Sequence, residues 1–243
     1  MKRLLQITLI AFLSLIIFET QAQKAGFKIG LNMANATLKD ADSTVSSDDK
    51  KILFAPRIGF TFEIPIQENL FIQTGIATTI SGFRFKNERA KGDIINGTFE
   101  IVETKDMFVL WYLELPVNLG VKFELDKNIH FIGMAGPVFR YMLYSTIAYK
   151  MDGEWDNEPT NVDNGSEKIK FFSNFDIGLN IEAGIQVDRF QFTLYYNPCF
   201  SNVWNEDFTG DSDVKWKNYN FGINIGIQFG QVDKGRRGGY RRR

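Results

Sequence analysis

The sequence WYLELPVNLGVKFEL, residues Trp111–Leu125, separates apolar from polar side chains with a period of two. Every second residue from Trp111 is apolar, whereas the alternate positions include Glu114, Asn118 and Lys122. Because successive side chains of a β-strand point to opposite faces, the stretch predicts a strand with one apolar face and one polar face.

The same alternation recurs along the chain and predicts eight strands in all. Their ranges are 26–34, 53–64, 70–81, 108–125, 129–143, 173–187, 190–200 and 218–229. No Asp, Glu, Lys or Arg falls on the apolar parity of any of them. The fifth range has the weakest phase, because Ile132, Met134 and Val138 lie on its other parity. A soluble β-sandwich would alternate in the same way, so alternation alone does not decide between a sandwich and a membrane barrel.

The lengths of the connections favour a barrel. Short connections (65–69, 124–128 and 188–189) alternate with long ones (35–52, 82–107, 144–172 and 201–217). If neighbouring strands pair antiparallel, all short turns lie at one end and all long loops at the other, as in bacterial outer-membrane barrels. The predicted strands also reach the ~9–11 residues that a tilted strand needs to cross a bilayer. The expected fold is therefore all-β, an eight-stranded antiparallel up-and-down transmembrane β-barrel.

The N-terminus has the features of a secretory signal peptide. Lys2 and Arg3 precede a largely apolar run from Leu4 to Phe18, and Thr20-Gln21-Ala22 places small residues before a cleavage site. This predicts a signal peptide over 1–22, a barrel over 23–230 and a C-terminal tail over 231–243. The mean hydropathy of the chain, −0.17, does not argue against a membrane location. In a strand with one lipid-facing side, apolar and polar residues alternate, so their hydropathies average to a value near that of a soluble protein.

Three motifs resemble the PorT-like outer-membrane β-barrel family of Bacteroidota. They are KAGFKIGLNMANA (residues 24–36), LELPVNLGVKF (residues 113–123) and MAGPVFRY (residues 134–141). The resemblance spans nearly the whole mature chain and implies a barrel in the outer membrane. The short turns of such barrels are periplasmic, and both termini join the short-turn end, so we expect both termini in the periplasm. The family's namesake takes part in type IX protein secretion, but the motifs specify a fold and transfer no mechanism.

The inward parity of the predicted strands carries a balanced set of charges. Four are positive and four negative: Lys28, Arg57, Glu63, Glu114, Lys122, Arg140, Asp176 and Glu182. An eight-stranded barrel is only wide enough to be filled by side chains, and charges buried there need partners. One interpretation is a structural salt-bridge plug, which we favour. The other is a gated ion path or proton relay, because charges within a membrane often mark one.

The sequence offers little for catalysis or for a cofactor. The only histidine, His130, is predicted beside the short turn at 124–128, whereas a hydrolase acting at the surface would need it among the long loops. The only cysteine, Cys199, is far from His130 in sequence, so no zinc pattern can be built. We therefore expect no enzyme, no metal and no cofactor. Aromatic residues near strand ends are expected in an interfacial girdle: Tyr141, Tyr144, Trp155, Trp204 and Trp216.

The C-terminal tail QVDKGRRGGYRRR is strongly basic. Its cations are Lys234, Arg236, Arg237, Arg241, Arg242 and Arg243. The formal total is −1, with +1 on residues 1–22 and +5 on the tail, so residues 23–230 carry −7. The tail is expected to bind outer-membrane lipid headgroups or a periplasmic protein, or to serve only as a solubilising extension. An exported chain meets no nucleic acid, which excludes RNA as a partner.

The leading functional hypothesis is a non-catalytic barrel, structural or partner-binding, whose loops or tail engage another protein. The alternative is a transport role, either passage of a small solute or an accessory part in protein secretion of the type IX kind. Both place the chain in the outer membrane.

Overall fold

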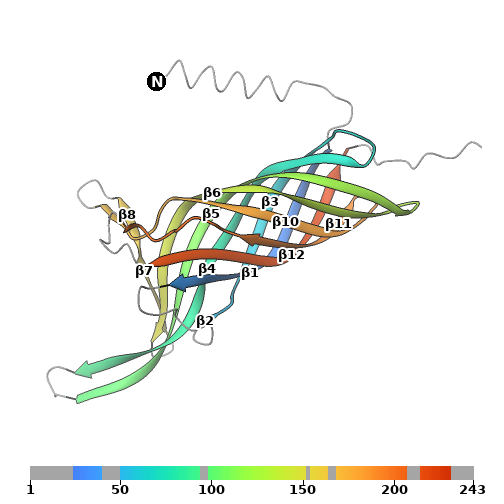
Figure 1. Ribbon diagram of the computed structural model, residues 1–243. Coiled ribbons are helices and arrows are strands. Elements are labelled where there is room, and N and C mark those ends of the chain that lie inside the picture. The colour runs from blue at the N-terminus through green and yellow to red at the C-terminus, as the bar shows by residue number, and fades with distance from the viewer. Residues whose placement is uncertain are drawn as a thin grey trace, which may run out of the picture.

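The computed structural model is a closed barrel of eight antiparallel strands, which confirms the expected fold (Figure 1). The structure describes residues 24–39, 50–93, 98–151, 154–163, 168–206 and 214–230. The predicted signal peptide and basic tail lie outside these residues. Within them, no helix is long and apolar enough to cross a membrane.

Each predicted strand is present, and several are longer than expected. The barrel strands are β1 (Lys24–Lys39), β3 (Leu53–Pro65), β4 (Leu70–Asp93), β5 (Thr98–Asp126), β6 (Ile129–Met151), β10 (Phe175–Val187), β11 (Phe190–Pro198) and β12 (Lys215–Phe229). Consecutive barrel strands pair antiparallel, and β1 pairs with β12 to close the ring. Closure gives every barrel strand a hydrogen-bonded neighbour on both sides, which a strand structure in lipid requires.

Side chains alternate between the outside and the lumen, as the period of two predicts. Trp111, Leu115 and Leu119 of β5 are exposed on the outer wall, whereas Glu114 and Asn118 are buried. Ile132, Met134 and Val138 of β6 point into the lumen and are at most 4% exposed, which explains the weak phase of that strand. Ile80, which the apolar parity of the predicted strand 70–81 places on the outside, is instead buried against lumen residues Ala34, Leu53 and Ala55.

Ile80 turns inward where β4 separates from β3. Pairing between these strands ends at Ile58↔Thr78, while the pairing of β4 with β5 continues from there to Asp93↔Thr98. Two residues after Ile80, Gly82 has a φ of +120. The carbonyl of Ile80 accepts a hydrogen bond from the Asn32 side chain in the lumen. The parity of a strand is lost at such an irregularity, because the backbone no longer follows the regular pleat.

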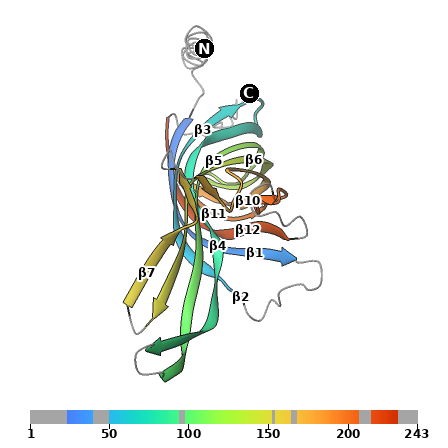
Figure 2. The ribbon, with the colours of Figure 1, turned by 90° about the vertical axis from the view of Figure 1, so that its left-hand side faces the viewer.

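Two of the connections predicted as loops are largely strand. The β4–β5 pairing continues to Asp93↔Thr98, well past the barrel rim, and β6 continues to pair with β7 (Glu154–Pro159). Both hairpins project from the same end of the barrel in the two views (Figure 2). Short strands β2 (Lys50–Lys51), β8 (Asn161–Asp163) and β9 (Lys168–Lys170) complete this end. We call it the loop end, and the opposite end the short-turn end.

The short-turn end holds three tight connections and both ends of the described barrel. β3 joins β4 through residues 66–69, β5 joins β6 through 127–128, and β10 joins β11 through Asp188-Arg189. Asp188 has φ 52, which a two-residue hairpin turn requires. Ala25 of β1 pairs with Phe229 of β12, so the chain enters and leaves the barrel at this end.

Candidate functional site

The eight charged residues predicted for the lumen all lie there and are buried. Their exposed fractions range from 0% for Glu114 and Asp176 to 8% for Lys122. They gather at three levels along the barrel axis, each with ion pairs between different strands. From the loop end towards the short-turn end, the levels are centred on Glu114, on the pair of Lys28 and Glu182, and on Glu63.

Glu114 is the centre of the first level. Its Oε2 accepts from Arg57 Nη2 at 2.9 Å, and its Oε1 accepts from Arg140 Nη2 at 2.7 Å. Arg140 also reaches Asp176, with Nη1 to Oδ2 at 3.8 Å, and donates to Sγ of Cys199 at 2.7 Å. One carboxylate from β5 thus joins guanidinium groups from β3 and β6 across the lumen, and both carboxylate oxygens are used.

Aromatic rings hold the two arginines from their other sides. The guanidinium carbon of Arg57 lies 4.6 Å from the ring centre of Tyr195, and that of Arg140 lies 5.7 Å from Tyr112. Tyr195 in turn donates its hydroxyl to Asn32 Oδ1 at 2.7 Å. Stacking of this kind stabilises a guanidinium without adding a further negative charge.

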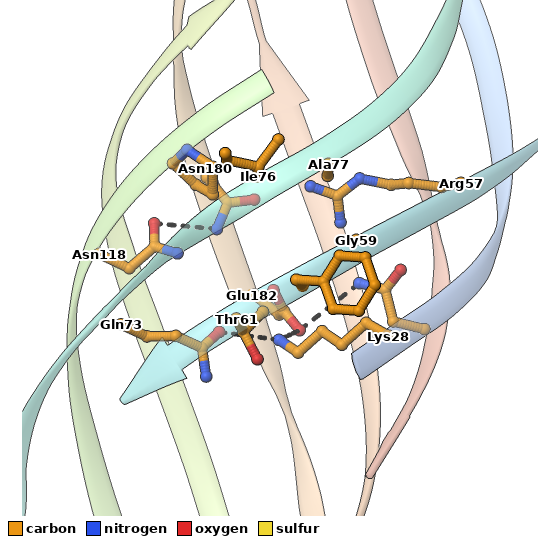
Figure 3. A pocket seen from close by; sticks show the side chains of 13 residues that line it. Lys28, Arg57, Gly59, Thr61, Gln73, Ile76, Ala77, Asn118, Asn180 and Glu182 are labelled. Carbon is orange, nitrogen blue, oxygen red and sulfur yellow. Dashed lines mark hydrogen bonds and ion pairs between the residues drawn. The ribbon is translucent and has the colours of Figure 1, made fainter. Parts of the chain in front are cut away.

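Lys28 and Glu182 form the second level (Figure 3). Lys28 Nζ lies 2.7 Å from Glu182 Oε1 and donates to Gln73 Oε1 at 2.9 Å. The hydroxyl of Thr193 donates to the same oxygen of Glu182. Asn180 donates to Asn118 at 3.0 Å in the adjoining space. The pair therefore sits among neutral polar groups, one of which accepts from Lys28 and another of which donates to Glu182.

Glu63 organises the third level, nearest the short-turn end. Lys122 Nζ lies 2.9 Å from Glu63 Oε1, and Gln228 Nε2 donates to Glu63 Oε2 at 2.7 Å. Lys24 approaches the same carboxylate at 3.9 Å. This level joins β1, β3, β5 and β12, so it ties the first and last strands of the barrel to the wall opposite.

A second, apolar group closes the lumen at the loop end, and the sequence analysis missed it. We call it the aromatic cap; its buried members are Ala36, Phe83, Leu110, Tyr112, Met142, Phe172, Val203 and Trp216. The rings of Phe83 and Phe172 each lie 5.0 Å from Trp216, centre to centre. A signal was present in the sequence, because Leu110 and Met142 are apolar residues on the inward parity of the predicted strands 108–125 and 129–143.

Two segments predicted as loop turn back into the barrel mouth to complete the cap. Ser173 N donates to the Val203 carbonyl at 2.8 Å, and Val203 N donates to the Trp216 carbonyl at 2.9 Å. These backbone bonds place Phe172 and Val203 over the first level of charges. The interior thus combines an ionic lower part with an apolar lid made from the chain itself.

The aromatic girdle predicted from the sequence needs correction. Trp216 is 2% exposed and belongs to the cap, and Trp204 is half-buried against it. Tyr141, Tyr144 and Trp155 are exposed on the outside. The two misassigned tryptophans face inward because Trp216 lies on the buried parity of β12 and Trp204 lies in the segment that folds back.

Little free volume remains among the lumen charges. A cavity of about 20 Å³ lies among Lys28, Arg57, Gln73, Asn118 and Glu182 (Figure 3). That volume holds about one water molecule. No group of three or more His, Cys, Asp or Glu side chains that could bind a metal ion occurs in the part of the chain that the structure describes.

His130 and Cys199 are far apart in the barrel. His130 begins β6 beside the turn at 127–128, and its backbone is in register with Glu124 and Gln186. Cys199 is buried next to Arg140 at the first level. The structure therefore does not bring the histidine to the hairpins of the loop end, nor to the cysteine.

Comparisons with known proteins identify a family. Residues 21–205 match the family described as "Outer membrane protein beta-barrel domain". No curated protein sequence matches the chain.

Solved barrels with low sequence identity also align with the structure. OprG from Pseudomonas aeruginosa is 11% identical, with 87% of this chain and 98% of that chain covered and a TM-score of 0.42. Neisserial surface protein A is 13% identical, with 84% and 97% covered and a TM-score of 0.38. Ail from Yersinia pestis is 11% identical, with 85% and 98% covered and a TM-score of 0.32. Identities this low do not carry a function from one barrel to another.

Proposed function

The chain belongs to the outer membrane protein beta-barrel domain family, and from this premise we propose that it is a non-catalytic, non-conducting barrel that presents a partner-binding surface at its loop end. It is exported by the signal peptide at 1–22 and has both termini in the periplasm. Within the family it is of the PorT-like kind of Bacteroidota, on the strength of the three motifs given above.

The observation that carries this proposal is that the lumen is occupied at every level. Glu114 is held between Arg57 and Arg140, Lys28 and Glu182 pair below them, and the aromatic cap covers both. A path for ions would require these side chains to separate, and separated charges in a narrow lumen lose their partners. The cavity of about 20 Å³ among Lys28, Arg57 and Glu182 is too small for a solute larger than water.

The loop end supplies the surface for a partner. The β4–β5 hairpin extends the barrel wall to Asp93↔Thr98, and the β6–β7 hairpin lies beside it in register from Thr146↔Pro159 to Met151↔Glu154. Hydrogen-bonded hairpins hold a binding surface in one shape, so a partner does not have to order it on binding. The short turns at the other end offer much less area.

Bilayer recording of the mature chain tests the closed lumen. We expect no step conductance of porin size from the wild type in planar bilayers. A variant with Arg140→Ala and Trp216→Ala removes one support of the plug and one of the cap, and should raise the frequency of transient openings. Stable large steps from the wild type would contradict the proposal and favour solute transport.

A second experiment addresses the partner. Mild detergent extraction followed by cross-linking should retain a protein on the wild type and lose it when residues 84–107 are replaced by a short turn. A secretion assay on a deletion strain separates the alternative role. Loss of a secreted protein, with no partner lost on hairpin removal, would favour an accessory function in secretion.

A further inference from the structure

A basic hollow lies on the outer wall of the barrel at the loop end, where β1, β11 and β12 meet. Its volume is about 320 Å³, and its wall includes Lys39, Lys215, Lys217, Tyr196 and Tyr219. We call it the lysine hollow. The three lysines are exposed and belong to the segments 35–52 and 201–217, which the sequence predicted as loops. Strand pairing brings them together, with β1 and β12 adjacent (Figure 1).

The lysines are placed so that they repel one another. Lys39 is directly opposite Lys215 in the β1–β12 register, and Lys217 follows two residues later on the same outer face. Like charges in directly opposed positions of an antiparallel pair destabilise the sheet. No carboxylate among the described residues forms an ion pair with any of the three. The arrangement therefore favours a bound anion.

The position of the hollow along the barrel indicates where that anion would come from. The outward residues of β12 are apolar from Phe229 to Phe221 and end in Tyr219. This segment has the ~9–11 residues that cross a bilayer, and tyrosine is typical of the boundary between hydrocarbon and headgroups. Lys217 and Lys215 are the next outward residues of β12 beyond Tyr219 in the direction of the loop end, so they lie at the depth of the lipid headgroups.

We propose that the lysine hollow binds the phosphate of a lipid headgroup in the leaflet around the loop end of the barrel. Lysine binds phosphate as a concentrated point charge, and three ammonium groups match a phosphate that is doubly charged. Tyr196 and Tyr219 line the same hollow and supply apolar surface next to the lysines. This inference depends on the outer-membrane location but not on whether the lumen conducts or which partner binds the hairpins.

Native mass spectrometry of the detergent-purified, full mature barrel tests the proposal. The probe is dioleoyl phosphatidic acid, compared with dioleoyl phosphatidylcholine, which has the same chains and no net charge. We expect the wild type to retain the phosphatidic acid preferentially. The triple variant with Lys39→Gln, Lys215→Gln and Lys217→Gln should bind it on the order of a hundredfold more weakly, since each basic residue near anionic lipid contributes about one factor of five.

The matched control removes three other exposed cations, through Lys127→Gln, Lys170→Gln and Arg189→Gln, and has the same net charge. It should bind phosphatidic acid as the wild type does. Equal losses in both variants would show that total charge alone governs binding, and no loss in either would overturn the site.

Two further arms separate the remaining explanations. Competition by inorganic phosphate at millimolar concentration would indicate an anion site that does not need a lipid, which contradicts the proposal. Segments 40–49 and 207–213 contain aspartates; if these neutralise the lysines, the wild type will show no preference for the phosphate lipid. A heat-modifiability gel confirms that each variant is folded. If the triple variant does not fold, the single variant Lys215→Gln replaces it, and its binding of phosphatidic acid should be several-fold weaker than that of the wild type.

Discussion

Glu114 is the residue on which most of the lumen depends. It is fully buried, and each of its two oxygens accepts hydrogen bonds from one arginine. A single neutral substitution here would remove the carboxylate that joins Arg57 and Arg140, while Asp176 stays near Arg140 and Glu182 stays paired with Lys28. Buried ion pairs are weak evidence for stability as a whole, but removing one partner is costly because the other charge stays buried.

Glu114→Gln should therefore lower the heat resistance of the folded barrel. We expect a loss of about 3–5 kcal/mol in the free energy of unfolding, the cost of an uncompensated buried charge. The measurement is the temperature at which the folded band on a gel shifts to the unfolded position. Glu124→Gln is the matched control, because Glu124 lies on the same strand and is exposed. Equal midpoints for the two variants would show that the network contributes nothing to stability.

At the scale of single elements, β4 changes its role along its length. Up to Thr78 it is a barrel strand paired on both sides, and beyond Gly82 it is one arm of a projecting hairpin. Gly82 allows this change because its φ of +120 is one that residues with a side chain rarely adopt. A Cβ at this position would also lie 2.0 Å from the Phe108 carbonyl oxygen.

Gly82→Ala should destabilise the loop end through this strain. The expected cost is about 1–3 kcal/mol, and the clash with Phe108 adds to it. Gly133→Ala is the control, since a Cβ there meets its nearest neighbour at an ordinary 3.5 Å. Urea titration of both variants measures the stability of the whole barrel, and hydrogen exchange of the β4–β5 hairpin measures local stability. Together they distinguish a local from a global loss of stability. If Gly82→Ala unfolds as the wild type does, the positive φ at residue 82 has no role in holding the hairpin.

The elements also show what the sequence could and could not predict. Lipid imposes an apolar outer face on every strand, so the eight strands and the inward charges could be found from parity alone. The extension of β4 and β5 could not, because residues 84–107 show no sustained alternation of apolar and polar side chains in the sequence. Nor could the partners: Lys28 and Glu182 are 154 residues apart, and only the closed register brings them together.

The two ends of the molecule differ in shape and in charge. Hairpins project at the loop end, whereas tight turns and both ends of the described chain lie at the other. The basic residues 231–243 follow β12 directly and so continue from the short-turn end. Their net charge of +5 is well suited to anionic headgroups of the nearer leaflet.

Deletion of 231–243 should leave the barrel folded, because every barrel strand ends at or before Phe229. It should weaken retention of the protein on anionic vesicles at low salt, with about 1 kcal/mol lost for each basic residue that contacts the surface. Flotation of the folded protein with vesicles of rising anionic content measures this. The heat-modifiable band serves as the control for folding. Retention that is unchanged at every salt concentration would exclude a role for the tail in lipid binding.

The seam between β1 and β12 has a consequence for how the protein is made. Its register runs from Ala25↔Phe229 to Lys39↔Lys215, so the first and last stretches of the barrel must meet along their whole length. Before the last strand is in place, the side of β1 that pairs with β12 is an open edge. Its backbone N–H and C=O groups find no hydrogen-bonding partner in lipid. Closure of the barrel therefore needs the last strand, and we expect a chain cut short before Lys215 to remain unclosed.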